Sequence, residues 1–454
     1  MDIIAAISTG PALSAIGIVR VSGEGCFALC DRVFHPLSGR PFSAARPREM
    51  VLGRLLDREG ASIDSCLAVR FPGPGSYTGE DCAEFHCHGS PVVLGEALAS
   101  LFAAGARQAG RGEFTKRAFL NGRMDLTQAE AVIDLIESET AQAARNAVEQ
   151  LGGALGRKLR TVYDALLNIA SQFYAVVDYP DEDIPDLGRE EILAALTRSE
   201  TALTALLATA SRGQVLRRGV PTAILGKPNA GKSSLLNALV GYDRAIVTGV
   251  AGTTRDTVEE KATAGGVLLR LIDTAGIRDA SDPVERLGVE RARRAAAEAE
   301  LALLVLDGSR PLTEEDREVI RTARAVPRVI AVQNKADLPR QWDPASLEAE
   351  LGTVLSLSAR EGDGLEALEA AIACLFPEDG TPRGEILTNA RQAESLSRAL
   401  VSLRGARAAL EDGLTPDAVL SDVERAMNAL GEVTGQTLRE DLTARIFERF
   451  CVGK

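Results

Sequence analysis

The spacing of apolar residues changes along the chain. Residues 1–118 contain short, mostly apolar runs, such as residues 16–21 and 66–71, separated by glycine, proline and serine. Runs of this length between turn residues are typical of strands, so this segment is predicted to be an α+β domain. From about residue 120, apolar residues recur every three or four positions, which is the pattern of amphipathic helices.

The first helical stretch covers residues 119–214. Thr127 and Glu130 form a capping-box pattern at its beginning, which predicts a helix whose first backbone N–H groups are satisfied by side chains. The stretch is interrupted at residues 179–185, where two prolines and several acidic residues predict a turn between helices.

The second helical stretch covers residues 379–454. Thr415 and Pro416 suit the start of a helix, because proline lacks the N–H that the first helical turn leaves unpaired. Apolar residues at helical spacing predict one buried face on each of two helices: Leu396, Leu400, Leu403, Ala406 and Leu410, then Leu420, Val423, Met427 and Leu430.

Between these stretches, residues 215–378 alternate short apolar runs with helical segments. This pattern predicts a parallel sheet with crossover helices. The economical interpretation is one helical domain interrupted by an inserted α/β domain, since insertions are tolerated where chain ends lie close together. Two separate helical domains are the alternative, because periodicity does not distinguish the two arrangements.

Composition agrees with a multidomain globular protein. The chain has 454 residues, of which 45% are hydrophobic and 25% charged. A single core stops growing at about 250–300 residues, so about three domains are expected. Apolar runs such as residues 301–306 are too short to span a bilayer, and the N-terminus lacks a basic targeting segment. No membrane association and a cytoplasmic location are therefore expected.

Charge and cysteine content narrow the expected chemistry further. The formal net charge of −13 disfavours non-specific nucleic-acid binding, which depends on neutralising phosphates. Seven dispersed cysteines, an odd number, indicate a reduced compartment and no disulfide framework. A local cluster of Cys82, His86, Cys87 and His88 matches no common zinc-binding spacing, so we predict buried thiols and polar loop histidines there.

A phosphate-binding loop follows the apolar run at residues 222–225. The segment Gly226-Lys-Pro-Asn-Ala-Gly-Lys-Ser233 has the pattern GxxxxGKS and opens a predicted helix. Glycines let backbone N–H groups wrap around phosphates without a clash at Cβ. Lys232 is predicted to reach the β- and γ-phosphates, and Ser233 to bind Mg²⁺, while the helix N-terminus adds its positive dipole.

Two further segments suit a nucleotide-dependent switch. The apolar run at residues 267–272 ends in Asp273-Thr-Ala-Gly276, where an acid can hold Mg²⁺ through water and a glycine can approach the γ-phosphate. Between the two motifs lies Gly252-Thr-Thr-Arg-Asp256, whose threonine hydroxyl is expected to complete the Mg²⁺ shell when triphosphate is bound.

Recognition of guanine is predicted from the segment Asn334-Lys-Ala-Asp337, which follows the apolar run at residues 329–332. A carboxylate accepts hydrogen bonds from guanine N1–H and the 2-amino group, a pair that adenine lacks. Asp337 is therefore predicted to select guanine, with Asn334 supporting it. The segment Ser358-Ala359-Arg360 follows another predicted strand, at residues 353–357, and suits the loop that closes over the base.

The motifs occur in order, each at the end of a predicted strand, which predicts a Ras-like α/β P-loop GTPase domain at residues 215–378. The predicted GTP-binding residues are Asn229, Ala230, Gly231, Lys232, Ser233, Ser234, Thr248, Thr254, Asp273, Thr274, Ala275, Gly276, Asn334, Lys335, Asp337, Ser358, Ala359 and Arg360. Ile277 stands where Ras-like switches have the glutamine that orients the attacking water, so another group must do this work.

The whole chain resembles the tRNA-modification GTPase family MnmE, also called TrmE. Outside the GTPase motifs, the resemblance rests on five strings and on the C-terminal Phe450-Cys-Val-Gly-Lys454. The strings are Gly17-Ile-Val-Arg-Val-Ser-Gly23, Ser76-Tyr-Thr-Gly-Glu-Asp81, Gly112-Glu-Phe-Thr115, Arg117-Ala-Phe-Leu-Asn-Gly122 and Asp125-Leu-Thr-Gln-Ala-Glu-Ala131.

The resemblance implies four chain segments and an activity. They are an N-terminal α+β folate-binding and dimerisation domain (1–118), an all-α helical domain in two parts (119–214 and 379–454) and the GTP-binding domain (215–378). The family adds a (carboxymethyl)aminomethyl group at C5 of the wobble uridine, U34, of certain tRNAs. It acts as a homodimer that forms a heterotetramer with an FAD-containing partner of the MnmG (GidA) type. A 5-formyl- or methylene-type tetrahydrofolate derivative supplies the one-carbon unit.

Family motifs also assign individual residues. The resemblance places folate contacts at Arg20, Glu84, Arg123 and Lys454, although the family usually has lysine where Arg123 stands. It places Mg²⁺ on Ser233 and Thr254, and a K⁺ ion that activates hydrolysis on Asn229, Thr248, Val250 and Thr253. Glu285 matches the glutamate that positions water. Cys451 has two interpretations of equal weight, a role in tRNA modification or a buried thiol.

Two other classes of GTPase remain as alternatives. An Era-like ribosome-assembly GTPase would act as an RNA-binding switch without modification chemistry, and it would need a basic RNA-binding module that this acidic chain does not offer. A structural, membrane-linked GTPase would need a basic amphipathic or lipid-anchored segment.

Overall fold

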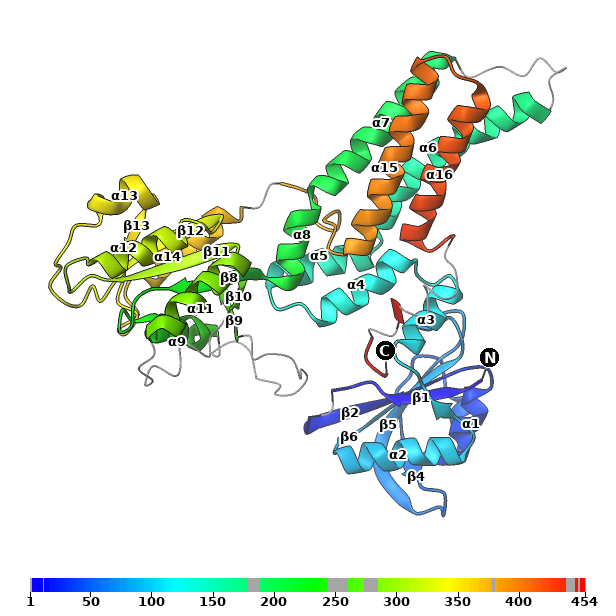
Figure 1. Cartoon of the computed structure of the whole chain (residues 1–454). Coiled ribbons are helices and arrows are strands. Elements are labelled where there is room, and N and C mark those ends of the chain that lie inside the picture. The colour runs from blue at the N-terminus through cyan, green and yellow to red at the C-terminus, as the bar shows by residue number, and fades with distance from the viewer. Residues whose placement is uncertain are drawn as a thin grey trace. The chain divides into compact units, whose positions relative to one another are not determined.

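The computed structural model describes residues 2–10, 12–178, 188–243, 260–272, 285–377, 380–437, 446–447 and 450–453 (Figure 1). The chain divides into two compact units. Unit 1 comprises Met1–Ile133, Glu149–Leu203 and Ser395–Lys454, and unit 2 comprises Asp134–Val148 and Thr204–Glu394. The predicted turn at residues 179–185 lies outside the described residues.

Unit 1 begins with a seven-stranded sheet in the order β3-β4-β5-β6-β2-β1-β7. The strands are β1 (Ile4–Ile7), β2 (Ser14–Ser22), β3 (Phe34–Pro36), β4 (Val51–Leu56), β5 (Ser62–Phe71), β6 (Cys82–Gly89) and β7 (Arg107–Gln108). Helices α1 (Cys26–Val33) and α2 (Pro91–Ala103) bury one face of the sheet, in a core that includes Val19 and Phe85. Successive side chains alternate in direction along a strand, so Arg20 and Glu84 lie on the opposite face.

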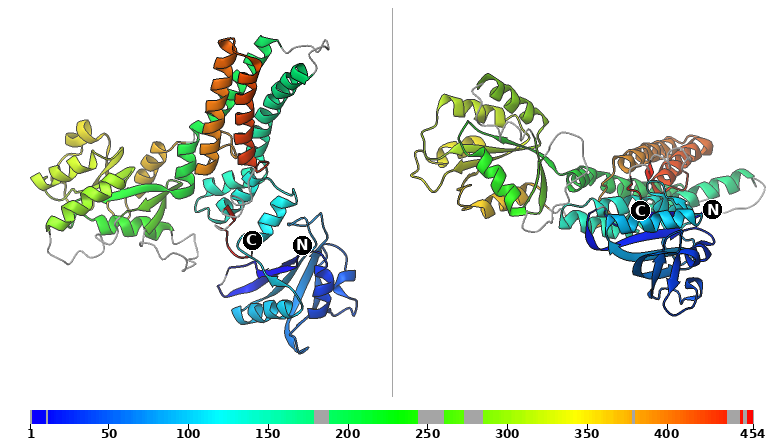
Figure 2. Two further views of the ribbon diagram at one scale, coloured as in Figure 1. Left: turned by 45° about the vertical axis from the view of Figure 1, so that its right-hand side comes forward. Right: turned by 90° about the horizontal axis from the view of Figure 1, so that it is seen from below.

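Helices form the rest of unit 1. They include α3 (Glu113–Leu120), α6 (Ala154–Asp178) and α16 (Pro416–Thr434). Four further helices have residues in both units: α4 (Leu126–Ile136), α5 (Ala141–Leu151), α7 (Arg189–Ala208) and α15 (Ala390–Glu411). Helix α6 packs along α16 (Figure 2). The predicted start of α16 is confirmed, with Thr415 as N-cap and proline in the first turn. Val423 and Leu430 are buried, as the periodicity predicts, but Leu420 and Met427 are only half-buried, and Val419 and Ala426 complete the buried stripe instead.

The predicted capping box of α4 is wrong by two residues. Asp125 and Gln128 form the reciprocal pair: Gln128 N donates to Asp125 Oδ1 at 2.9 Å, and Asp125 N donates to Gln128 Oε1 at 3.0 Å. Thr127 already lies inside the helix, and its hydroxyl donates to the same Asp125 carboxylate at 2.6 Å. An ionised aspartate is the stronger acceptor for the first N–H groups, so the helix begins earlier than the threonine suggested.

Unit 2 contains a six-stranded sheet in the order β13-β12-β11-β8-β10-β9. The strands are β8 (Val220–Leu225), β9 (Glu260–Ala264), β10 (Val267–Leu271), β11 (Leu301–Asp307), β12 (Arg328–Asn334) and β13 (Val354–Ser356). All neighbours are parallel except β9 and β10. The predicted parallel sheet is therefore present, with an antiparallel edge.

Helices cover both faces of this sheet. Helices α9 (Lys232–Asp243) and α14 (Leu365–Leu375) share one apolar core with it. Helices α11 (Glu285–Glu298), α12 (Glu314–Ala323) and α13 (Ala345–Leu351) flank the other core, and α8 (Ala210–Arg218) precedes the first strand. In an open sheet of this kind, ligands bind at the carboxyl ends of the strands. None of the helices in the described part of the chain combines the length and apolarity needed to cross a bilayer.

Candidate functional site

The phosphate-binding loop connects the buried end of β8 to the first residue of α9. Asn229 and Gly231 take left-handed backbone conformations, with φ of 63° and 101°. A Cβ at Gly226 would lie 2.4 Å from the Val305 carbonyl oxygen, and one at Gly231 would lie 2.0 Å from Asn334 Nδ2. Both end glycines of the GxxxxGKS pattern are therefore required by close neighbours, not only by flexibility.

Lys232 lies across this loop. Its ammonium group donates to the carbonyl oxygens of Gly226 and Lys227, both at 2.8 Å, and burial lowers the pKa of the group. An anionic phosphate offers a stronger partner than these carbonyls, so the ammonium is placed for exchange from loop to ligand. Ser233 and Ser234 follow in the first turn of α9, where backbone N–H groups and the helix dipole favour an anion.

The P-loop is also tied to a neighbouring helix. Lys227 Nζ lies 2.8 Å from Asp316 Oδ2 and donates to Thr313 Oγ1 at 2.7 Å. Thr313 and Asp316 form the capping box of α12. The second residue of the P-loop pattern is therefore held by the start of a helix more than eighty residues later.

The predicted guanine-binding segments meet the P-loop through Asn334. This side chain is 2% exposed; its Nδ2 donates to the Ala230 carbonyl oxygen at 2.9 Å, and its Oδ1 accepts from Ala359 N at 3.0 Å. Ser358 Oγ donates to Asp337 Oδ1 at 2.7 Å, which orients the carboxylate predicted to select guanine. Three segments widely spaced in the sequence thus form one site at the carboxyl ends of β8, β12 and β13.

Other predicted residues contribute less to this geometry or are not described. The Arg360 side chain is 84% exposed, so it does not pack against the rest of the loop. Lys335 follows Asn334 with a left-handed φ of 65° and forms an ion pair described below. Thr248, Val250, Thr253, Thr254, Asp273, Thr274, Ala275 and Gly276 lie outside the described residues, and the Glu285 side chain is not described.

A second polar site lies on the open face of the N-terminal sheet. Arg20 on β2 and Glu84 on β6 are paired in register, and Arg20 Nη2 lies 2.8 Å from Glu84 Oε1. The Arg20 guanidinium lies 5.1 Å from the ring centroid of Tyr77 and 5.6 Å from that of Phe114. These two aromatic residues were not predicted to line a site, although they stand in the motifs that carried the resemblance.

The remaining predicted folate residues border the same domain. The Arg123 stem packs against Gly79, in the loop between β5 and β6. Lys454 lies outside the described residues, but Gly453 is anchored beside β1, where its carbonyl oxygen accepts from Ser8 Oγ at 2.9 Å. The C-terminal tail therefore lies on the N-terminal sheet domain.

The two predictions about cysteines have different outcomes. Cys451 is exposed, so its interpretation as a buried thiol is wrong. Its backbone is held in place, since its carbonyl oxygen accepts from Gly112 N at 3.2 Å. Cys82 and Cys87 are buried, as predicted for structural thiols. The prediction of loop histidines is wrong, because His86 and His88 both lie on strand β6, where the exposed His88 pairs with Asp64 at 2.8 Å.

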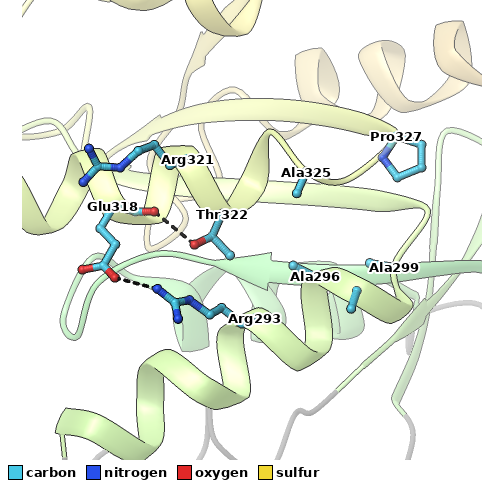
Figure 3. A pocket seen from close by; sticks show the side chains of 9 residues that line it. Arg293, Ala296, Ala299, Glu318, Arg321, Thr322, Ala325 and Pro327 are labelled. Carbon is cyan, nitrogen blue, oxygen red and sulfur yellow. Dashed lines mark hydrogen bonds and ion pairs between the residues drawn. The ribbon is translucent and has the colours of Figure 1, made fainter.

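A shallow cavity of about 720 Å³ lies between α11 and α12 (Figure 3). Four of its nine lining residues are alanines, and Arg293 and Glu318, which also line it, form an ion pair at 3.2 Å. The lining residues all lie outside the predicted motifs. The nucleotide site is therefore defined by hydrogen bonds among the loops and not by this cavity.

A doubly wound sheet with a P-loop at β8 and an Asn-Lys-x-Asp segment at β12 defines a GTP-binding protein of the P-loop class. Comparison with known proteins gives the family. Residues 126–451 match the model of the MnmE helical domain, and residues 3–123 match that of the GTP-binding protein TrmE N-terminus. The chain belongs to the MnmE (TrmE) family of tRNA-modification GTPases, which confirms the predicted family and enzyme class.

Relatives with full-length similarity support this membership. The tRNA modification GTPase MnmE of Roseiflexus sp. (strain RS-1) is 44% identical over 466 residues, covering 100% of this chain and 99% of the relative. That of Heliobacterium modesticaldum is 43% identical over 464 residues, with the same coverage. Among solved structures, the G domain of the T. maritima FeoB iron transporter is 28% identical and covers 35% of this chain and 98% of its own, at a TM-score of 0.26.

Proposed function

We propose that this chain is a K⁺-activated GTPase that modifies tRNA together with an FAD-containing partner. The reaction adds a (carboxymethyl)aminomethyl group at C5 of the wobble uridine, U34, of certain tRNAs, and a tetrahydrofolate derivative supplies the one-carbon unit. The observation that carries this proposal is identity above 40% to tRNA modification GTPases over the full length of the chain. A homodimer and a heterotetramer with the partner belong to the same proposal.

The residues of the P-loop suit binding of Mg²⁺ and GTP. Ser233 lies in the first turn of α9, directly after Lys232, whose ammonium group lies across the loop; this suits a Mg²⁺-bound phosphate. Lys232 neutralises charge on the β- and γ-phosphates, while Asp337 and Asn334 hold the base. When bound, Mg²⁺ and K⁺ would spread the charge of the transferring phosphoryl group. Thr254 is proposed to share Mg²⁺ with Ser233.

K⁺ and the attacking water are assigned to residues of the P-loop, the first switch segment and α11. The proposed K⁺ ligands are Asn229, which stands exposed on the P-loop, and residues of the first switch segment: Thr248, Val250 and Thr253. Glu285, at the first residue of α11, is proposed to orient the attacking water, because Ile277 offers no hydrogen-bonding group.

The open face of the N-terminal sheet fits a folate. Arg20 and Glu84 offer a donor and an acceptor next to two aromatic rings, which suits a flat heterocycle with polar edges. His86 Nε2 is buried and has no hydrogen-bond partner among the described residues; it lies 3.5 Å from Glu84 Oε2. A bound pterin would satisfy such an atom. Arg123 and Lys454 are proposed to contact the same ligand, and the exposed Cys451 to serve tRNA modification.

Nucleoside analysis of tRNA tests the modification directly. Cells that lack this protein should lose the modified wobble uridine, and the wild-type gene should restore it. Lys232→Ala should not restore it, whereas Arg58→Ala, a change in an exposed hairpin side chain, should do so. If cells with and without the gene contain the same amount of the modified wobble uridine, the proposal is wrong and a ribosome-assembly switch is favoured.

The cation requirement is tested separately. Purified protein should turn over GTP at least about tenfold faster in K⁺ than in Na⁺ at equal ionic strength, because the ion substitutes for an arginine finger. Equal rates in the two salts would remove K⁺ from the mechanism without affecting the assignment of GTP.

A further inference from the structure

Asp307, the last residue of β11, has no part in the function described so far. We propose that Asp307 is a positioning residue for guanine recognition and that it acts by holding Lys335. The inference rests on the GTP site proposed above. It adds a residue outside the sequence motifs to the set that determines how tightly guanine nucleotides bind.

The two side chains are brought together by strand register. Strands β11 and β12 are parallel, and Asp307 is paired with Asn334, the residue that precedes Lys335. Lys335 Nζ donates to Asp307 Oδ2 at 2.6 Å. The Asp307 side chain is only 13% exposed and that of Lys335 only 28%, so solvent screens this charged hydrogen bond less than it screens a surface pair.

The backbone of Lys335 needs such support. Its φ of 65° lies in the left-handed region, which a residue with a long side chain adopts only when its surroundings hold it there. Ala336 N donates to the Leu357 carbonyl oxygen at 3.1 Å, and Leu338 N donates to that of Lys335 at 3.0 Å. These bonds hold the loop backbone, and the ion pair with Asp307 holds the side chain.

Asp307 is itself held by several neighbours. Its Oδ1 accepts from the backbone N and the hydroxyl of Ser309, at 2.9 and 2.6 Å, which leaves Oδ2 directed at Lys335. Its carbonyl oxygen accepts from Trp342 Nε1 at 2.9 Å. Burial alone would raise the pKa of the Asp307 carboxyl, but the hydrogen bonds from Lys335 and Ser309 outweigh it and lower the pKa. The group is therefore ionised at neutral pH.

This arrangement prepares the site for a base. Lys335 stands between Asn334, which ties the P-loop to the closing loop, and Asp337, which is oriented by Ser358. A free lysine stem loses much rotamer entropy when a ligand orders it. Because Asp307 already holds the ammonium group, that loss occurs on folding and not on nucleotide binding, which strengthens binding through preorganisation.

The test is a double-mutant cycle in the full-length protein. GDP affinity is measured by calorimetry for the wild type, Asp307→Ala, Lys335→Ala and the double variant. Asp307→Ala should weaken GDP binding about tenfold, the effect of losing one charged hydrogen bond. In the Lys335→Ala background, Asp307→Ala should alter GDP affinity by less than about twofold, because the lysine that Asp307 holds is already absent.

A matched control removes an ion pair elsewhere in unit 2. Glu350 pairs with Arg324 at 3.0 Å on the surface, and Glu350→Ala should leave GDP affinity unchanged. Wild-type affinity in Asp307→Ala would overturn the inference, as would an equal loss in both backgrounds, which would mean that Asp307 supports the domain and not Lys335. Failure of the wild type to bind GDP would instead contradict the proposed GTP site.

A second variant and an optical signal guard against a folding defect. Asp307→Asn keeps an acceptor for Ser309 but offers Lys335 only a neutral partner, so about threefold weaker binding is expected. Trp342 is the single tryptophan of the chain and donates to Asp307, so its fluorescence should change on GDP addition and report folding of the variants. Full wild-type affinity in Asp307→Asn would count against a role for the carboxylate charge.

Discussion

Arg117 illustrates how a charge is buried in the N-terminal sheet domain. Its guanidinium is 4% exposed and bonds to the carboxylates of Asp2, Glu80 and Glu113, at 2.8, 3.0 and 3.0 Å. Glu113 also accepts from Arg107 at 2.6 Å and from Gly110 N at 2.7 Å. A buried charge without such partners is strongly destabilising, so these residues depend on one another.

The Glu113 carboxyl should make stability depend on pH. Burial alone would raise its pKa, but hydrogen bonds from Arg107, Gly110 N and Arg117 lower it to about 2. A carboxyl whose pKa is lower in the folded state than in the unfolded state stabilises the folded protein at every pH above its unfolded pKa. For Glu113 this stabilisation is lost as pH falls from about 5 towards 2. Glu113→Gln should therefore cost about 1–2 kcal/mol at pH 7, allowing for solvent screening, and progressively less in acid.

Hydrogen exchange of the β1 amides measures this locally. The free energy of opening in the wild type and in Glu113→Gln should converge between about pH 5 and pH 3. A difference that stays constant over this range would show that the lost hydrogen-bond geometry, and not the charge, is responsible.

At the scale of elements, α8 and the segment 384–388 lie in close contact within unit 2. A Cβ at Gly213 in α8 would stand 1.8 Å from the Leu387 carbonyl oxygen. Thr209 Oγ1, just before the helix, accepts from Leu387 N at 3.0 Å. Residues 209–213 and 384–388, which precede and follow the predicted GTP-binding domain, therefore pack directly against each other. The absence of a side chain at Gly213 allows this close approach.

Two helical glycines provide a matched test of that contact. Gly213→Ala should destabilise unit 2 by about 2–3 kcal/mol, because the new methyl group meets backbone that cannot move aside. Gly241→Ala, in α9 with nothing within 4 Å, should instead stabilise by up to about 1 kcal/mol through helix propensity. Thermal unfolding midpoints compare the two; similar shifts would show that helix propensity alone governs both positions.

At the scale of the whole molecule, the two units draw their cores from the chain differently. The two cores of the unit 2 sheet consist of residues between Val220 and Ile372. In contrast, the core beside α4 joins Leu126 and Ala129 to Phe447 and Phe450, and α6 packs on α16. We therefore propose that residues 215–378 form an independent domain, and that residues 119–214 do not.

Separate expression of the two fragments checks this proposal. Residues 215–378 should unfold cooperatively and bind GDP, because their apolar contacts are internal. Residues 119–214 should lack a cooperative transition, since a helical face without its partner exposes apolar surface to water. Circular dichroism distinguishes the outcomes, and a cooperatively folded 119–214 fragment would contradict the interpretation of one interrupted helical domain.

The P-loop and the order of strands and helices were predictable from the sequence, because they depend on local requirements. Gly226 and Gly231 mark positions where a Cβ has no room, and apolar periodicity marks which faces are buried. The error at α4 arose between two adjacent local signals, Thr127 and Asp125, both of which can cap a helix. The class of protein followed because several such local signals agreed.

Only the tertiary structure decided which distant side chains share a site. Asn334 joins the P-loop to the closing loop, Tyr77 and Phe114 lie beside Arg20, and Asp307 holds Lys335. These contacts depend on strand register, on loops that meet at one edge of a sheet, or on a helix that packs against the sheet, and none of them follows from spacing along the chain. The sequence by itself determined the phosphate-binding chemistry, since backbone geometry there is set by adjacent residues. How that site is held in place was decided by residues that only folding brings together.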